Sequence, residues 1–379
     1  MYNTHDTFLD ENENFELFSM FMEEIMKNFK KMAVCMLIFS LLITATGCAK
    51  KATVLEYSGS KMDSGMFSYA LSENKSYQLY NITGANTDNP ELWVYEISDG
   101  KTYAEYFMES FIENCKLMLI SDAECKRLGI EISEEQAANV QEIIDAGIEE
   151  QSSLAKLNVY LASYGINTDV FKEYLNLTTR FSDLVDYYYG ESGIEKFSEQ
   201  DYIDYLKDNY TLVQHILYMT TKTVDDESGA ESEVDMTDEE KTALHDEIQA
   251  KVDLINSGEK TYEDYIDENQ DSNVDYLVNE SSSFVQEFLD AALDMEIGEV
   301  RIVETTYGYH VMRKIDITSE KYAELYSDVL GYNYSIVSTN RTYLEQESLY
   351  NKLSEHLDDV IVNDDEIAKF DVITAPIVE

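Results

Sequence analysis

The chain has 379 residues, of which 44% are hydrophobic and 12% aromatic, enough to build several modest cores. Its 76 acidic and 27 basic residues give a formal net charge of −49 at pH 7. Such a charge repels phosphate backbones and anionic lipid headgroups, which excludes nucleic acid as a partner. The simplest interpretation is a solvated surface that keeps the protein soluble, and the alternative is binding of cations or basic polypeptides.

The first predicted element is a targeting segment. A basic stretch, MKNFKK at 26–31, precedes the apolar run AVCMLIFSLLITA and then TGC, which ends at Cys48. This order is typical of a bacterial lipoprotein signal. The run is shorter than the roughly 20 residues that a helix needs to cross a bilayer, so a transmembrane anchor is the weaker alternative. We therefore expect residues 1–47 to be an upstream extension with a signal peptide, and Cys48 to carry the lipid that anchors the protein to the extracytoplasmic face of the cell membrane.

Residues 48–211 are predicted to form a mostly helical domain. The alternation in ATVLEYSGSKM predicts a strand, and helical spacing follows from Asp63 or Ser64. A turn-rich stretch around Trp93 predicts a loop, and a series of helices follows between residues 101 and 190, the second of them over the run SEEQAANVQEIIDAGIEEQSSLAKLNVYLASYG.

The pattern changes at Leu212, where LVQHILYMT predicts a short strand. A loop rich in acidic residues follows, and then a helix that begins at the capping box of Thr237 and Glu240 and ends at Gly258. NVDYLVN is a candidate strand, FVQEFLDAALDM a helix, and GEVRIVETTYGYHVMRKIDI two strands joined at a Tyr-Gly turn. The predicted domain at 212–318 therefore has the order βααβαββ.

The last predicted part is a C-terminal helix and tail at residues 319–379. Helical spacing returns from Ser319 to about Asn363, and residues 368–379 are β-rich. We expect this part to pack back onto the helical domain. The predicted fold class is α+β, with a mostly helical domain and a small antiparallel sheet flanked by helices.

Common catalytic motifs are missing from the sequence. It contains no Walker loop, no Rossmann glycine triplet, no HExxH and no CxxC, so neither a cofactor nor a metal is expected. The acidic run DENQDSNVD around Asp271 lacks the glycine and the closing glutamate of a calcium loop. A solvated loop is the better interpretation of this run.

Two histidines lie inside apolar strand patterns, His215 in VQHIL and His310 in YGYHVM. For either one alone, a hydrogen-bonded core residue is the more common explanation. Strand alternation places His310 on one face with Gly308 and Met312, without saying which face is inward. The pair in this order is more informative than either histidine.

Residues 213–317 resemble the parvulin-type, or PpiC-type, peptidylprolyl isomerases. The resemblance rests on HIL after a β residue, on FVQEFLDAALDMEIGEV, and on TYGYHVMRK. Upstream, the helical region with the helix start GIEISEE is similar to the chaperone region of the PrsA foldase lipoproteins and their SurA relatives. The predicted lipidation motif that ends at Cys48, the lipobox, is in keeping with a PrsA lipoprotein. The resemblance implies a membrane-anchored foldase whose partners are unfolded or partly folded exported polypeptides.

The resemblance also implies roles for individual residues. The catalytic positions would be His215, Asp275, Thr305 and His310. Phe284 and Phe288 would line the slot for the proline ring, although one apolar helix face packed on a sheet explains them equally well. Asp275 also has a non-catalytic explanation, as a solvated carboxylate at the end of a strand.

The stretch SNVDYLVNESS departs from the parvulin pattern, which has a longer, glycine-rich loop similar to GGDLGWF in this place. That loop frames the pocket, so an active isomerase and a non-catalytic holdase both stay open as functions. Two other classes are a solute-binding lipoprotein and a structural surface lipoprotein. Helices around one small sheet disfavour the first, which should show repeated βα units in two lobes. A lack of binding to unfolded exported proteins would favour the second.

Overall fold

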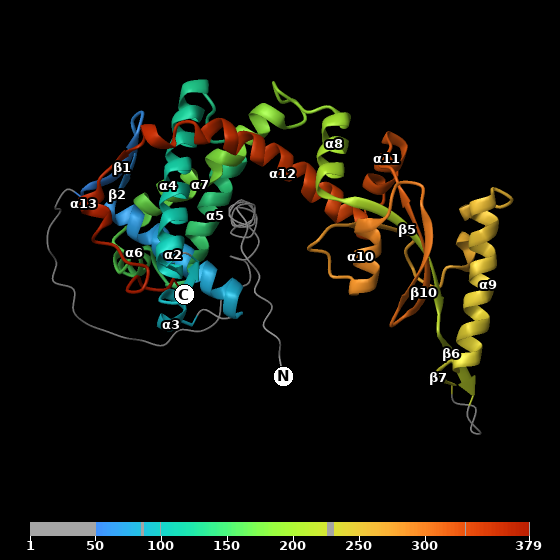
Figure 1. Ribbon diagram of the computed structural model, residues 1–379. Coiled ribbons are helices and arrows are strands. Elements are labelled where there is room, and N and C mark those ends of the chain that lie inside the picture. Colours follow the sequence, from blue (N-terminus) through green and yellow to red (C-terminus); the bar gives the residue numbers. More distant parts are fainter. Residues whose placement is uncertain (1–50, 85–86, 99, 226–230, 330, 379) are drawn as a thin grey trace. The chain divides into compact units, whose positions relative to one another are not determined.

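The computed structural model describes residues 51–84, 87–98, 100–225, 231–329 and 331–378 (Figure 1). Cys48 and the predicted signal lie outside these residues. Within the described ranges, no helix combines the length and the apolar character that crossing a membrane requires. The fold class is α+β, as the sequence predicts. The chain forms two compact units, unit 1 from Met1–Lys196 with Gln346–Glu379 and unit 2 from Phe197–Glu345.

Unit 1 contains a small antiparallel sheet with the strand order β11-β1-β2. Its strands are β1 (Thr53–Tyr57), β2 (Ser60–Asp63) and β11 (Ile361–Val362). The sequence predicts one strand where β1 and β2 form a hairpin. Ser58 and Gly59 form the turn, both with positive φ, the geometry that tight hairpins require.

Helices make up most of unit 1, and several begin at the side-chain caps that their sequences carry. Asp63 accepts hydrogen bonds from the amides of Gly65 and Met66 at the start of the first helix. The helices are α2 (Ser64–Thr83), α3 (Pro90–Trp93), α4 (Tyr103–Leu128), α5 (Glu134–Glu150), α6 (Leu154–Ala162), α7 (Thr168–Tyr189) and α13 (Asp364–Ile367). A short hairpin joins α3 to α4, formed by β3 (Glu96–Ser98) and β4 (Lys101–Thr102). The single helix predicted over α5 and α6 is interrupted because Ser152 has a positive φ of 68° and Ser153 caps α6.

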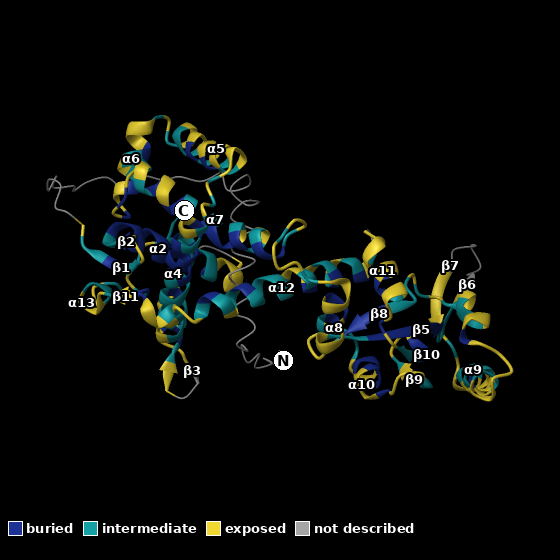
Figure 2. Cartoon of the chain, turned by 90° about the horizontal axis from the view of Figure 1, so that it is seen from above, coloured by how far each residue is buried: buried dark blue, intermediate teal, exposed yellow. Residues whose placement is uncertain are grey.

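The core of unit 1 is rich in aromatic rings, and its buried residues concentrate on α2, α4 and α7 (Figure 2). Phe67 of α2 contacts Phe111 of α4 and Phe370, with ring centroids 5.0 and 4.9 Å apart. Segments that lie about 300 residues apart in sequence therefore share one core.

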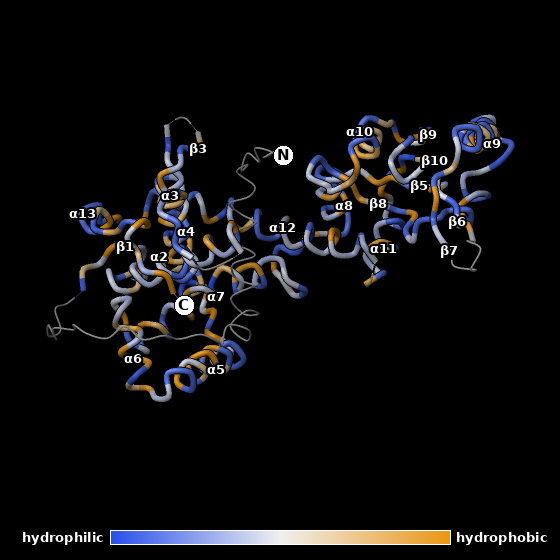
Figure 3. The backbone as a smooth tube through the Cα atoms, turned by 90° about the horizontal axis from the view of Figure 1, so that it is seen from below, coloured by the Kyte–Doolittle hydropathy of each residue, from blue (hydrophilic) through white to orange (hydrophobic). Residues whose placement is uncertain are grey.

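Unit 2 is built on an antiparallel sheet with the order β8-β5-β10-β9. Its strands are β5 (Thr211–Met219), β8 (Asp275–Val278), β9 (Val300–Thr305) and β10 (Gly308–Ile315). Helix α10 (Gln286–Asp294) packs on one face of this sheet, and α9 (Asp238–Ser257) with the 3₁₀ helix η1 (Tyr262–Glu268) packs on the other. Hydrophobic residues recur along these strands (Figure 3), and their side chains form both interfaces.

The acidic stretch after β5, predicted as a loop, contains a second hairpin. Its strands are β6 (Thr221–Asp225) and β7 (Glu231–Asp235). The following helix, α9, starts and ends as its sequence predicts. Thr237 and Glu240 form the capping box, and Gly258 ends the helix in the left-handed conformation with φ 79°.

The boundaries of unit 2 differ from those that the sequence suggests. Helix α8 (Glu199–Asn209), helix α11 (Ser319–Ser327) and the first part of α12 (Tyr332–Ser354) belong to unit 2. The reason is a shared core in which Leu206 of α8 packs with Leu277 and Tyr322. The rest of α12 and the residues after it belong to unit 1.

The β-rich tail predicted at 368–379 does not form strands in its described part. Residues 371–375 form a turn, in which Thr374 and Ala375 both donate to the carbonyl oxygen of Asp371. The prediction is wrong because β propensity needs a neighbouring strand to satisfy the backbone. Here, side chains of unit 1 accept and donate those hydrogen bonds instead.

Candidate active site

Strand register brings the two predicted histidines together on one face of the unit 2 sheet. His310 is paired with Leu217 and Met312 with His215, so the histidines are diagonal neighbours on adjacent strands. Their Nδ1 atoms lie 3.0 Å apart and their rings stack with centroids 5.2 Å apart. Both side chains are buried, and the face they share is the one covered by α10.

The hydrogen bonds of this pair can be oriented from their partners. His215 Nε2 lies 3.1 Å from the carbonyl oxygen of Asn273 and 3.2 Å from Oδ2 of Asp271. Both partners are acceptors, so Nε2 of His215 carries the proton and its Nδ1 accepts one from His310. Nε2 of His310 then accepts from the hydroxyl of Thr305, which lies 2.8 Å away. The hydrogen bonds thus run in one direction, from Thr305 through both rings to Asp271.

Burial keeps both rings neutral. It lowers the pKa of His215, and it lowers the pKa of His310 to about 4, with His215 adding to the shift. Partial burial opposes ionisation of Asp271, but the backbone amide of Asn273 and the nearby His215 outweigh it, so the pKa of this carboxyl lies below its ordinary value. At neutral pH the cluster is therefore an uncharged pair of rings that ends in one carboxylate.

Aromatic side chains form the apolar wall beside the histidines. Phe288 meets both rings edge-on, with centroids 5.5 Å from His215 and 5.3 Å from His310. Phe284 stacks on Phe288 at 5.0 Å, and Tyr276 contacts both. Phe288 is only 2% exposed and belongs to the core, whereas the half-buried Phe284 is accessible to a ligand.

Asp275 does not join this cluster. It is paired in register with Gln214, the neighbour of His215, so its side chain lies on the opposite face of the sheet. There it forms an ion pair with Lys321, with Nζ and Oδ2 2.7 Å apart, and accepts from Gln214 at 2.9 Å. Both charged side chains are largely buried. Asp275 thus forms contacts within unit 2, and its side chain does not reach the predicted catalytic position beside the histidines.

Asp271 takes the place beside the histidines, and sequence reasoning assigned it to a solvated loop. The loop is held by Asn269, whose side chain accepts from the backbone amides of Leu217 at 2.7 Å and Asp271 at 3.1 Å. Tyr276 adds a hydroxyl that donates to Asp271 at 3.1 Å. The available signal was the dense run of short polar residues directly before β8, a composition that favours tight side-chain to backbone hydrogen bonds.

Thr305 is positioned by the turn between β9 and β10. Its Oγ1 accepts from the amide of Tyr307 at 3.1 Å while its hydroxyl faces His310. Gly308 has φ 143°, and a Cβ there would collide with the carbonyl oxygen of Tyr218. The predicted Tyr-Gly turn is therefore needed for the approach of β10 to β5.

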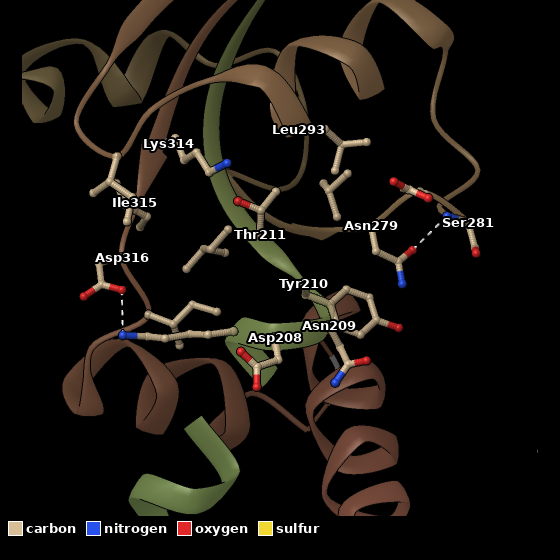
Figure 4. A pocket seen from close by; sticks show the side chains of 16 residues that line it. Asp208, Asn209, Tyr210, Thr211, Asn279, Ser281, Leu293, Lys314, Ile315 and Asp316 are labelled. Carbon is tan, nitrogen blue, oxygen red and sulfur yellow. Dashed lines mark hydrogen bonds and ion pairs between the residues drawn. The ribbon is translucent and has the colours of Figure 1, made fainter. Parts of the chain in front are cut away.

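A separate cavity of about 590 Å³ lies where β5 begins and β8 and β10 end (Figure 4). Its walls include Tyr210, Leu293 and Lys314, together with Lys207, whose Nζ forms an ion pair with Asp316 at 2.7 Å. None of the residues predicted for the catalytic site lines this cavity. The buried histidine cluster with its aromatic wall is therefore distinct from this cavity.

Residues 203–318 match the family model of the PPIC-type PPIASE domain. This match confirms the parvulin-type domain recognised from the sequence, and it covers all the predicted catalytic positions. Comparison with curated proteins gives no match.

Several solved structures are similar to the chain. The peptidylprolyl isomerase PrsA from Bacillus cereus is 19% identical with a TM-score of 0.28, over 70% of this chain and 92% of that one. PrsA from Bacillus subtilis is 17% identical with a TM-score of 0.23, over 68% and 90%. The foldase protein PrsA from Streptococcus pneumoniae is 13% identical with a TM-score of 0.24, over 71% and 95%. At these low identities and TM-scores the likenesses carry no weight of their own.

Proposed function

We propose that the chain, whose residues 203–318 are a PPIC-type domain, is an extracytoplasmic foldase that isomerises prolyl bonds in exported polypeptides. The observation that carries this proposal is the hydrogen-bonded series Thr305, His310, His215 and Asp271 beside the aromatic wall. Its partners are unfolded or partly folded polypeptides. Neither a cofactor nor a covalent intermediate is needed for this reaction.

The chemistry requires only that the amide be easier to twist. Peptide rotation has a barrier of about 18–20 kcal/mol because the twisted state loses resonance. Resonance also separates charge, so the planar amide is the more polar of the two states and loses more when water is removed. A proline ring against Phe284 would place its amide next to the neutral histidine pair, in drier surroundings. Each 1.36 kcal/mol or so of preference for the twisted state gives about a tenfold rate increase.

A holdase that binds without catalysis is the second candidate. The observation that favours it is the segment 272–282, which lacks the glycine-rich loop of the parvulins. In this chain the segment contains β8, and only residues 279–282 after it form a short turn, in which the Ser282 hydroxyl and the Ser281 amide both donate to the side chain of Asn279, each at 3.1 Å. This turn frames less of the site than a longer loop would.

Two assays on the full chain separate the candidates. Isomerisation of a short proline-containing peptide should be accelerated, and Thr305→Val should lower kcat/KM because it removes the donor to His310. Thr306→Val, at the exposed neighbouring position, serves as the matched control. Suppression of client aggregation without any isomerisation would identify the holdase instead, and the absence of both would contradict the foldase proposal.

Membrane attachment through Cys48 completes the proposal. The lipobox places a thiol at the acylation point, and stable anchoring by lipid requires more than one acyl chain. Cys48→Ala should therefore release the protein from membranes in a fractionation after carbonate washing. If the variant stays bound as firmly as the parent, the apolar run of the signal is itself the anchor.

A further inference from the structure

A short segment of unit 1, residues 371–378, is held by a buried lysine. Lys75 of α2 is 0% exposed, and its Nζ donates to the carbonyl oxygens of Ile373 at 3.1 Å and Ala375 at 2.8 Å. The same Nζ pairs with Asp88 at 3.0 Å. A buried ammonium is costly unless each of its protons has an acceptor, and here two of the three acceptors are main-chain atoms of this segment.

Two further contacts also involve only the main chain of the segment. The hydroxyl of Tyr164 donates to the carbonyl oxygen of Ile377 at 3.0 Å. The amide of Val378 donates to Oγ of Ser76 at 2.7 Å. Unit 1 thus offers three side chains, Lys75, Ser76 and Tyr164, that recognise a backbone, and we call this set the seat.

Val372 is the one fully buried side chain of the segment, and Ile373, Ala375 and Val378 are half-buried. Val372 is 0% exposed, whereas Thr374 and Pro376 are exposed to solvent. Ile377 is half-buried. Recognition through the backbone with a single fully buried aliphatic side chain tolerates many sequences.

We propose that the seat is a binding site for short apolar segments of unfolded polypeptides, and that residues 371–378 occupy it as an intramolecular stand-in for a client. The inference rests on the proposed foldase function and names where the client's backbone binds. The ligand it fits is a stretch with one buried aliphatic residue, with charges tolerated only at exposed positions and proline tolerated four positions after the aliphatic residue.

An intramolecular occupant competes with any client. A tethered segment acts at an effective concentration in the mM range, about that of a short flexible linker. A client's apparent affinity is its intrinsic affinity multiplied by the fraction of molecules in which the seat is free. Releasing the segment should therefore raise affinity for a peptide by about tenfold or more.

The first test uses a chain that stops at Phe370 and a fluorescent peptide with the sequence DVITAPIV. The shortened chain should bind this peptide about tenfold more tightly than the full chain in anisotropy titrations. A peptide with lysine at the Thr374 position should bind within about threefold of it, and one with aspartate at the Val372 position should not bind. Lys75→Met in the shortened chain should abolish binding.

A second pair of variants keeps the full chain. Val372→Asp removes the anchor and leaves the seat intact, so it should also raise peptide affinity, whereas Thr374→Asp, at an exposed position of the same segment, should not. Near-ultraviolet circular dichroism of the single tryptophan, Trp93, checks that unit 1 is folded, because this buried ring lies 5.9 Å from Nζ of Lys75.

The outcomes separate this inference from the foldase proposal. Equal peptide affinity of all these chains, or binding of the native sequence alone, would overturn the inference and make the segment a structural strap. Prolyl isomerisation measured on the same samples reports on unit 2. If isomerisation persists while peptide binding fails, only the seat is refuted, and if binding follows the pattern without isomerisation or aggregation suppression, only the foldase proposal fails.

Discussion

The two units are assembled from the chain in different ways. Unit 2 is one continuous stretch, Phe197–Glu345, although within it β5 pairs with the distant strands β8 and β10 and only β9 and β10 follow each other closely in sequence. Unit 1 is assembled from two stretches, and β11 pairs with β1 although about 300 residues separate them. A continuous unit can be recognised from local patterns, whereas a discontinuous one depends on contacts that no local pattern encodes.

The units also differ in how they treat buried ionisable groups. Unit 1 buries the charged Lys75 and surrounds it with acceptors, while unit 2 buries two histidines as neutral rings. A buried charge stays stable only if all its hydrogen-bond acceptors are present. A neutral pair stays stable only if each ring nitrogen meets a partner of the opposite kind, a donor for an acceptor. Single substitutions should therefore lower stability for different reasons in the two units: by leaving a buried charge without partners in unit 1, and by leaving a neutral hydrogen-bonding group without its partner in unit 2. The following experiments test this difference.

The largest effect is expected at Lys75. Lys75→Met removes the ammonium that joins α2 to Asp88 and to two carbonyl oxygens, and breaking such a buried set costs about 3 kcal/mol of unfolding free energy. Urea unfolding monitored at Trp93 measures it. Lys156→Met, at an exposed position of α6, should cost little. Parent-like stability of Lys75→Met would mean that the segment does not close unit 1.

His310→Ala should cost about 2 kcal/mol, because it leaves His215 Nδ1 and the Thr305 hydroxyl without their partner. The pKa of His310 is lowered from 6.5 to about 4 in the folded state, so its contribution is full above about pH 6.5 and is lost as the pH falls toward 4. The variant should therefore lose part of the parent's acid sensitivity. Thermal melting between pH 4 and 7 measures both effects, with the exposed His356→Ala as control.

Glu73 in unit 1 predicts the opposite pH dependence. Burial raises its pKa from 4.5 to about 7 although Tyr174 and Tyr69 donate to it. Its favourable contribution is present below about pH 4.5 and is lost as the pH rises through 7, because the unfolded chain ionises first. Glu73→Gln should gain about 2 kcal/mol at pH 8 and little at pH 4. A gain of equal size at both pH values would show that ionisation is not the cause.

Asp271 and Asp275 provide a matched pair within unit 2. Asp271→Asn should lower kcat/KM for prolyl isomerisation about tenfold, because the series from Thr305 then ends without a carboxylate. Asp275→Asn should keep the activity and lose about 1 kcal/mol of stability, since it breaks the ion pair with Lys321. The reverse pattern would restore Asp275 to the site and remove Asp271.

The smallest effect is expected at the acidic hairpin β6–β7. Replacing residues 223–233 by an Asn-Gly turn should change the unfolding free energy by less than about 0.5 kcal/mol, because closing a longer surface loop costs little. The described residues of this hairpin are mostly exposed. A loss of several degrees in melting temperature would show that the hairpin packs on or binds something.

Sequence by itself determined the local elements and much of the site. The capping box at Thr237, the alternation around His310 and the helix with Phe288 all follow from spacing, because caps and periodicity act over a few residues. The parvulin-type domain was identified from the resemblance of residues 213–317 to that family, and the family model confirms it.

Only the tertiary structure decided which carboxylate faces the histidines and where residues 371–378 lie. Register between β5 and β8 turns Asp275 away, and Asn269 folds the preceding loop so that Asp271 reaches His215. Strand register and side-chain to backbone hydrogen bonds between distant segments depend on the whole packed unit. For the same reason the predicted β-rich tail forms no strand: the carbonyl oxygens of Ile373 and Ala375 accept hydrogen bonds from the ammonium of Lys75 and not from a neighbouring strand.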